Sequence, residues 1–422
     1  MNNVETTLKT DVQMYIKTAH NIGKYLAKEA LWYKDMCNWT GHEVAPVGDK
    51  YETVIKACSI DLYSGLTGIA LFLSELYEKT QDPVILHTLN GALRTIYYNM
   101  DNGEKVNNYG YYSGKIGVGY TLWRIGKKSG NTELATKGIT YVKSVKDKDI
   151  ADYEVDIISG AAGSISALLR LYDGEKDEEL LAIAKKCGDF LLNKAYKKDD
   201  IYSWMTVDTK NALTGYSHGA SGIASALMEL YAVTKQEEYW HAAIGGFNYE
   251  KKWFNQQTQN WPDLREYDGT KPPSYGVMWC HGAPGIAIAH LKAYEMTKHD
   301  YFLQEAKIAV ETTKRGVIQE TNANSYANFS LCHGLAGNSD ILLYASQILN
   351  NPEYVQIARN AGDFGIRQYD ATGVVFPSGV NDPSGQTIGQ QENPGLMLGL
   401  SGTGMFYLRL ADMHNIPSAL VP

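Results

Sequence analysis

The chain has 422 residues, 44% of them hydrophobic and 20% charged, a balance that is ordinary for soluble globular proteins and allows one large domain or several smaller ones. Its net charge of -8 argues against a general nucleic-acid-binding function, because no Lys/Arg stripe offsets the acidic excess. The five cysteines lack the dense spacing of a disulfide framework, and no secretory signal or run of about eighteen apolar residues is visible, so we expect a cytoplasmic protein with reduced cysteines.

Two kinds of helical segment alternate along the chain. Seven segments are amphipathic, at 12–30, 82–100, 131–147, 177–196, 236–254, 300–315 and 352–368. Between them lie stretches that are hydrophobic nearly all round, for example 69–77, 223–231, 286–294 and 405–410. Such a stretch is typical of a helix buried on several sides. The short polar connectors between the two kinds predict αα-hairpins.

A Gly-x-x-Gly motif precedes each buried helix. The seven motifs begin at Gly65, Gly114, Gly160, Gly219, Gly282, Gly334 and Gly399. Steps of 46 to 65 residues between them indicate repeated supersecondary units. Seven amphipathic helices alternating with seven buried ones predict a single all-α domain over residues 1–422, an α/α barrel of seven helix hairpins. An open helical-repeat solenoid is the alternative, but its inner helices would not be apolar on all sides.

The residues just before each first glycine are expected to line one rim of this barrel, because the inner helices run parallel. In chain order they are Ser64, Ser113, Ser159, His218, His281, His333 and Leu398. One position earlier stand Tyr63, Tyr112, Ile158, Ser217, Cys280, Cys332 and Met397. Two of the five cysteines therefore occupy equivalent positions in adjacent repeats, and metal-binding side chains concentrate in repeats four to six.

This concentration of cysteine and histidine predicts a zinc site. Two thiolates and one imidazole are a good ligand set for Zn2+, and three protein ligands with an open fourth position are typical of a catalytic zinc. Cys280 and Cys332 are the expected thiolates, while His281 and His333 compete for the third place. Each residue alone would be interpreted as a buried apolar side chain or a helix cap, but the two aligned Cys-His-Gly motifs favour a metal.

Two further residues are candidates for acid/base chemistry on the same rim. His218 has no cysteine neighbour and is therefore available for proton transfer, although a helix-capping role is also plausible. Asp156 lies four residues before Gly160 and is expected to orient His218 or to bind substrate. An ordinary acidic residue near a helix N-terminus is an equally good interpretation of Asp156.

The motifs resemble those of the lanthionine synthetase C family over essentially the whole chain. The matching segments are Ser217-His-Gly-Ala-Ser-Gly222, Trp279-Cys-His-Gly-Ala-Pro-Gly285, Leu331-Cys-His-Gly-Leu-Ala-Gly337 and Gly399-Leu-Ser-Gly-Thr-Gly404. The resemblance implies a double-layered α/α toroid of seven helix pairs. It also implies zinc ligands at Cys280, Cys332 and His333, with His218 and Asp156 in the active site.

The resemblance implies a zinc-dependent cyclase of lantibiotic biosynthesis, which adds cysteine thiols of a dehydrated precursor peptide to dehydroalanine or dehydrobutyrine and so forms thioether rings. His218 or His281 is expected to protonate the resulting enolate. A dehydratase and an exporter are the implied partners, in a complex that would hold the chain at the membrane periphery. One bacterial family member carries an arginine where this chain has Gly276, and Arg265 is the nearest candidate to replace it.

Two other functions are compatible with parts of the pattern. A carbohydrate-active α/α enzyme would need two carboxylates at the rim, and only Asp156 stands near a glycine motif. A non-catalytic zinc protein that captures thiols such as glutathione is the second alternative. It is suggested by His281, which follows the first zinc cysteine here as in eukaryotic members of the family.

Overall fold

A computed structural model describes residues 2–47, 50–102, 106, 108–323, 328–380 and 393–422. Within these residues the chain forms fourteen α-helices and three short β-hairpins. The apolar helices of the seven repeats are α2 (Leu66–Thr80), α4 (Lys115–Ser129), α6 (Ala161–Glu175), α8 (Ala220–Thr234), α10 (Ala283–Thr297), α12 (Leu335–Leu349) and α14 (Leu400–Asp412). The amphipathic helices are α1 (Asn2–Glu29), α3 (Pro83–Asn102), α5 (Thr132–Lys143), α7 (Glu178–Lys194), α9 (Glu237–Trp253), α11 (Asp300–Asn322) and α13 (Pro352–Gln368).

Apolar and amphipathic helices thus alternate along the chain, as expected from the sequence. The amphipathic segment predicted at 352–368 has the bounds of α13, whereas α1 begins ten residues earlier than predicted and α11 ends seven residues later. Apolar helices pack on their amphipathic neighbours in the pairs α2–α3, α4–α5, α6–α7, α8–α9 and α12–α13, and α14 packs on α1. These pairs are the predicted helix hairpins, apart from the α14–α1 pair, which joins the two ends of the chain.

The Gly-x-x-Gly motifs place the start of every apolar helix. The first glycine is the N-cap in each, as Gly219 is for α8, and the helix begins at the next residue. The second glycine lies in the first helical turn, directly under the loop that precedes it. A Cβ at Gly222 or Gly337 would collide with the carbonyl oxygen six residues earlier, of Tyr216 or Leu331. The motif therefore lets the loop fold back onto its helix, which brings the residues before the first glycine to the helix N-terminus.

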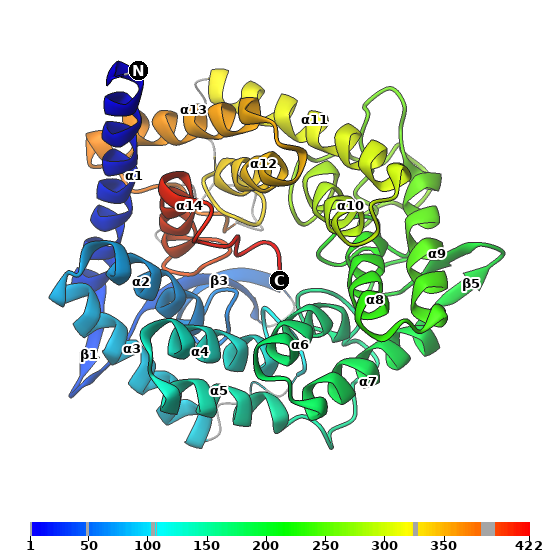
Figure 1. The fold of residues 1–422 in the computed structure, drawn as a ribbon, viewed down its shortest axis with the longest axis horizontal. Helices are drawn as coiled ribbons and strands as arrows, with labels where there is room; N and C mark the ends of the chain where they lie inside the picture. Colours follow the sequence, from blue (N-terminus) through cyan, green and yellow to red (C-terminus); the bar gives the residue numbers. More distant parts are fainter. Residues whose placement is uncertain (1, 48–49, 103–105, 107, 324–327, 381–392) are drawn as a thin grey trace. The chain divides into compact units, whose positions relative to one another are not determined.

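The chain forms two compact units. The first contains residues 1–105 and 316–421, and the second contains residues 106–315 and Pro422. In the first unit α14 packs against α1, α2 and α12 (Figure 1). In the second unit α6 packs against α4 and α8, and α8 packs against α10, with α5, α7 and α9 along the other side of these helices (Figure 1). The single domain expected over residues 1–422 stays a prediction.

Three β-hairpins were not expected from the helical periodicity. The longest pairs β3 (Thr40–Val47) with β4 (Lys50–Ala57), with Thr40 opposite Ala57, and stands between α1 and α2. The others pair β1 (Leu31–Tyr33) with β2 (Met36–Asn38) and β5 (Tyr196–Lys198) with β6 (Ile201–Ser203). In the part of the chain that the structure describes, no helix combines the length and the apolar character needed to span a membrane.

Candidate active site

The residues singled out by the sequence lie in the loops that lead into α6, α8, α10 and α12. Cys332 and His333 belong to the first unit, whereas Asp156, His218 and the Cys280-His281 pair belong to the second. Every one of these residues stands within four positions of an N-cap glycine. Their local positions therefore follow from the glycine motifs described above.

Neighbouring loops are joined by backbone hydrogen bonds at the position two residues before the glycine. In the first unit, the Cys332 amide donates to the Met397 carbonyl (2.9 Å), and the Met397 amide donates to the Tyr63 carbonyl (2.8 Å). In the second unit, the Ser217 amide and hydroxyl donate to the Cys280 carbonyl, at 3.4 and 3.1 Å. Positions that the sequence aligns as equivalent are thus direct neighbours within each unit.

Cys332 is buried, with 4% of its surface exposed, and it forms no disulfide. The Tyr63 hydroxyl lies 3.1 Å from its Sγ atom. A phenolic O–H is a better hydrogen-bond donor than a thiol, and a thiolate can only accept, so Tyr63 is the donor. The sulfur of Cys332 is therefore held by a polar partner in an otherwise buried position.

His333 is oriented by its loop in a way that suits a metal ligand. Its Nε2 atom lies 2.8 Å from the carbonyl oxygen of Gly379. A carbonyl only accepts hydrogen bonds, so Nε2 carries the proton and Nδ1 keeps its lone pair. Hydrogen bonds of this kind fix the tautomer of metal-binding histidines. The Nδ1 atom of His333 is consequently the available ligand atom.

Cys280 is also buried and free of disulfides. The loop that contains Cys280 contacts the loop before α8, and each loop turns sharply at a glycine with positive φ. These glycines are Gly282, with φ +101°, and Gly215, with φ +98°. A Cβ at Gly215 would lie 3.0 Å from the Cys280 carbonyl oxygen, so the close approach of the two loops requires glycine. Cys280 supplies the second sulfur of the predicted ligand set Cys280, Cys332 and His333, the candidate metal-binding group, which stays a prediction.

His218 and Asp156 form an ion pair in the second unit. The Nδ1 atom of His218 lies 2.5 Å from Oδ2 of Asp156, which is 2% exposed. The other carboxylate oxygen accepts the backbone amide of Ser159 at 2.7 Å, which fixes the carboxylate in its loop. Burial opposes protonation of His218, but the hydrogen bond and the charge of Asp156 outweigh it and raise the pKa of His218 above its usual value.

His281 lies next to His218 but has the opposite electrostatic environment. The two ring centroids are 6.1 Å apart, and His281 is only 1% exposed. Its Nδ1 atom has no hydrogen-bond partner among the described residues and lies 3.9 Å from Oδ1 of Asp263. Burial, followed by the positive charge of Arg265, lowers the pKa of His281 to about 4, against the opposing charge of Asp263. His281 is therefore neutral near pH 7.

The Arg265 side chain binds the Asp263 carboxylate: Nε donates to Oδ1 at 3.1 Å and to Oδ2 at 3.0 Å, and Nη2 donates to Oδ2 at 2.6 Å. The Arg265 side chain is about half exposed, and the Asp263 carboxylate that it binds also lies near the His281 ring. At Gly276, where the sequence lacks the family's arginine, the backbone carbonyl accepts a hydrogen bond from the Asn260 side chain at 3.0 Å. The positive charge that acts on His281 thus comes from Arg265, which lies eleven positions before Gly276 in the chain.

Glu250 is a residue of this site that the sequence analysis missed. It lies on α9 and is 1% exposed, and its Oε1 atom accepts the backbone amides of Gly215 (3.0 Å) and Ser221 (2.8 Å). These amides stand three residues before and three after His218, so one carboxyl group holds both ends of the His218 loop. Burial raises the pKa of Glu250 to about 8. A glutamate in the apolar face of a helix was the available signal.

The other three cysteines have different surroundings. Cys37 lies in β2 and contacts the Thr88 carbonyl, and Cys187 lies inside α7. Cys58 follows β4 and is half-buried. Burial raises the pKa of each of these thiols to about 12. They are protonated near neutrality and stand outside the candidate metal-binding group.

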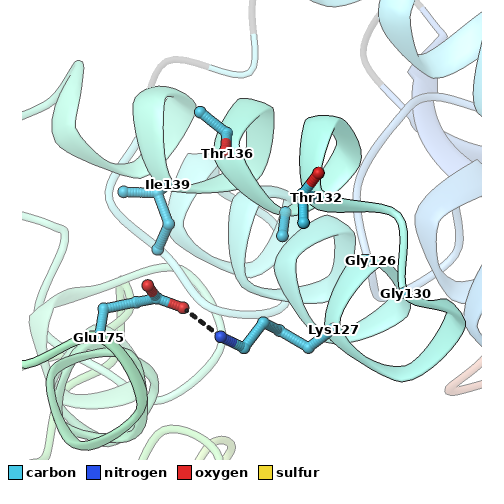
Figure 2. Close-up of a pocket in the computed structure, with 8 residues that line it drawn as sticks. Gly126, Lys127, Gly130, Thr132, Thr136, Ile139 and Glu175 are labelled. Atoms are coloured by element: carbon cyan, nitrogen blue, oxygen red, sulfur yellow. Dashed lines mark ion pairs between the residues drawn. The ribbon is translucent and has the colours of Figure 1, made fainter.

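Two hollows in the second unit differ in their relation to these residues. One, of about 410 Å³, lies over α4 and α5 beside the Lys127–Glu175 ion pair (Figure 2), and none of the predicted site residues lines it. The other, of about 560 Å³, is formed by the loop 263–274 and includes Asp263 and Arg265. Of these two hollows, only the second is lined by Asp263, the residue that lies 3.9 Å from His281.

The chain is similar in sequence to several known proteins. The lacticin 481/lactococcin biosynthesis protein LcnDR2 of Lactococcus lactis subsp. lactis is 29% identical over 319 residues, which are 73% of this chain and 32% of that protein. The chain thus spans about a third of the length of this relative. The nisin biosynthesis protein NisC of the same organism is 22% identical over 333 residues, 70% of this chain and 76% of that protein.

A third relative, the glutathione S-transferase LANCL1 of Danio rerio, is 25% identical over 190 residues, 42% of each chain. Among solved structures, nisin cyclase superposes with a TM-score of 0.64 at 16% identity, covering 99% of this chain and 96% of its own. This likeness and the helix pairs described above confirm the predicted fold class, an all-α α/α toroid of helix hairpins. The sequence profile of the lanthionine synthetase C-like proteins matches residues 57–421, and the chain belongs to this family.

Proposed function

We propose that the chain is a zinc-dependent lanthipeptide cyclase. It would join a cysteine thiol of a dehydrated precursor peptide to the β-carbon of a dehydroalanine or dehydrobutyrine in the same peptide. The observation that carries the proposal is the pairing of a Cys, Cys, His donor set with a carboxylate-bound histidine, both on the glycine-motif loops. Two relatives that are named for lacticin and nisin biosynthesis support the substrate class.

The residues fit zinc by their chemistry. Cys280 and Cys332 offer buried, unbridged sulfurs, and His333 presents Nδ1 because Nε2 is committed to a carbonyl. Two sulfurs and one imidazole nitrogen are ligands that Zn2+ prefers, and three protein ligands leave one position for a substrate. When bound there, zinc would lower the pKa of a substrate thiol, which is otherwise about 8.5.

The chain's own residues account for the proton balance of the reaction. The addition forms one C–S bond, converts the C=C bond of the dehydroamino acid to a single bond, and moves one proton from sulfur to the α-carbon. His218 would deliver this proton from Nε2, because Nδ1 is committed to Asp156. The raised pKa of His218 favours its protonated form, whereas the lowered pKa of His281 disfavours protonation of that residue. These opposite directions support His218 rather than His281 as the donor.

Asp156 would act on the substrate through His218. Its carboxylate holds the imidazole in one orientation and stabilises the imidazolium, while the Ser159 amide holds the carboxylate. The 560 Å³ hollow with Asp263 and Arg265 offers a charged wall for the peptide beside His281. A dehydratase would supply the substrate and an exporter would remove the product, and both are proposed partners of the chain.

A zinc protein that adds or captures glutathione-type thiols is the second candidate. It is favoured by the similarity to the glutathione S-transferase LANCL1 and by His281, which follows Cys280 in the motif. The same donor set and the same His218–Asp156 pair would serve this reaction. The two candidates therefore differ in the thiol that is used, not in the groups that activate it.

The test is a thiol count on a dehydrated precursor peptide that carries its own cysteines. The zinc-loaded protein is incubated with the peptide, free thiols are alkylated, and rings are counted by mass spectrometry. Loss of alkylatable thiols without added glutathione is expected. Glutathione adducts with intact peptide thiols would select the second candidate instead. Neither product from a protein that holds one zinc would reject both.

A further inference from the structure

We propose that Tyr63 is a positioning residue of the metal site, whose hydroxyl donates a hydrogen bond to the Cys332 sulfur and limits the charge that this sulfur gives to the metal. The inference rests on the proposed zinc site and adds a residue from the first repeat to it. It is carried by one contact within the first unit, the 3.1 Å separation between the Tyr63 hydroxyl and Cys332 Sγ.

The backbone around Tyr63 holds the ring in place for this contact. The Tyr63 carbonyl accepts the Met397 amide, and the Met397 carbonyl accepts the Cys332 amide, so the loops of repeats one, seven and six are joined in sequence. The Asp61 carboxylate also accepts the Ser64 amide at 2.8 Å, which fixes the residue after Tyr63. The tyrosine side chain therefore reaches across the Met397 loop from a fixed backbone.

A hydrogen bond to a metal-binding thiolate changes the metal as well as the sulfur. The donor draws electron density from the sulfur, so the ligand donates less charge to the metal. Cys332 is only 4% exposed and receives little help from water, which makes a protein donor more important. Cys332 would thus donate less charge to the metal than it would without Tyr63, and the metal would keep more positive charge for a substrate thiol.

Tyr112 provides a matched control. It occupies the position equivalent to Tyr63 in the second repeat and is fully buried. Its ring packs edge-on against Trp279, with 5.4 Å between centroids, and against Tyr111 at 4.8 Å. Substitution of Tyr112 by Phe keeps this packing and changes one hydroxyl, as substitution of Tyr63 does. The two variants therefore separate the sulfur contact from a general effect of losing a rim hydroxyl.

The experiment uses the full chain with Co2+ in place of zinc, because sulfur-to-cobalt charge transfer reports on thiolate donation directly. In Tyr63→Phe the charge-transfer band should move to longer wavelength, because the sulfur donates more charge to the metal. Zinc affinity, measured by competition with a chromophoric chelator, should fall by about tenfold, because the buried thiolate that binds the metal loses its hydrogen-bond donor. Tyr112→Phe should match the wild type in both measurements. Thermal unfolding of each variant checks that the fold is retained.

The outcomes distinguish this inference from the proposed function. A Tyr63→Phe protein that binds one Co2+ with the wild-type band and wild-type affinity would overturn the inference and leave the zinc site intact. An equal shift in Tyr112→Phe would also overturn it, because the effect would not come from the contact with Cys332. A wild-type protein that binds no metal through its cysteines would reject the proposed zinc site itself.

Discussion

Nδ1 of His218 lies 2.5 Å from Oδ2 of Asp156, although 62 positions separate the two residues in the chain. The carboxylate is not free to turn, because its second oxygen accepts the Ser159 amide. The pair therefore has one defined geometry, with the histidine as donor at Nδ1. The sequence left Asp156 open between an ordinary acidic residue near a helix N-terminus and a residue that orients His218 or binds substrate. One of its oxygens accepts the Ser159 amide of its own loop, and the other contacts His218.

Asp156→Asn should separate the charge of this pair from its shape. Removal of the charge removes the main interaction that raises the pKa of His218, so its pKa should fall. A proton donor is lost as pH rises through its pKa. Cyclisation by the variant should therefore decline at a lower pH than cyclisation by the wild type, with a rate about ten- to a hundredfold lower at pH 7. The measurement is the pH–rate profile; identical alkaline limbs would contradict the role of Asp156.

His218→Ala and His281→Ala should differ in rate but not in metal content. If His218 protonates the enolate, its removal should slow ring closure by roughly two to four orders of magnitude while zinc and peptide binding persist. His281→Ala should have a smaller effect, because burial keeps His281 neutral near pH 7. Zinc content and single-turnover rates on a dehydrated precursor peptide are the measurements. A His218→Ala protein that cyclises at the wild-type rate would leave His218 as a structural residue.

The repeat and the candidate residues could be predicted from sequence because the information is local. Each Gly-x-x-Gly motif marks a helix start, and Gly222 shows why: its loop carbonyl occupies the space of a side chain. The hairpin β3–β4 was not predicted because it lies between the helical segments expected at 12–30 and 69–77, where the helical pattern predicts no element. The Tyr63 contact with Cys332 and the role of Glu250 were not predicted, because their partners are far away in the sequence, 269 positions for Tyr63 and 35 or 29 positions for Glu250.

Cys332→Ala should lose zinc without unfolding the protein. Helices α12 and α14 beside it are held by apolar packing, so the core does not depend on the metal. The matched control is a triple variant in which Cys37, Cys58 and Cys187 are replaced by Ala, since these thiols lie outside the candidate metal-binding group. Elemental analysis should give about one zinc per chain for the control and none for Cys332→Ala, with helical circular dichroism retained in both. Loss of zinc from the control would show that the ligand set is wrong.

Glu250→Gln should change how stability depends on pH. In the folded chain the pKa of Glu250 is about 8, above its ordinary value of 4.5, because the group is buried. The folded state therefore binds the proton more tightly than the unfolded state does. Stability contributed by this group is complete below about pH 4.5 and is lost as pH rises from there to about 8. The loss in the wild type is expected to be on the order of a few kcal/mol.

Glutamine keeps an oxygen for the Gly215 and Ser221 amides but cannot ionise, so the variant should lack this loss. The free energy of unfolding of Glu250→Gln, measured in urea, should therefore gain on the wild type between pH 5 and pH 8. Glu250→Ala should be less stable than both at pH 5, because it leaves two amides at the His218 loop without their acceptor. A stability difference between Glu250→Gln and the wild type that does not change with pH would show that Glu250 is ionised in the folded protein at both pH values.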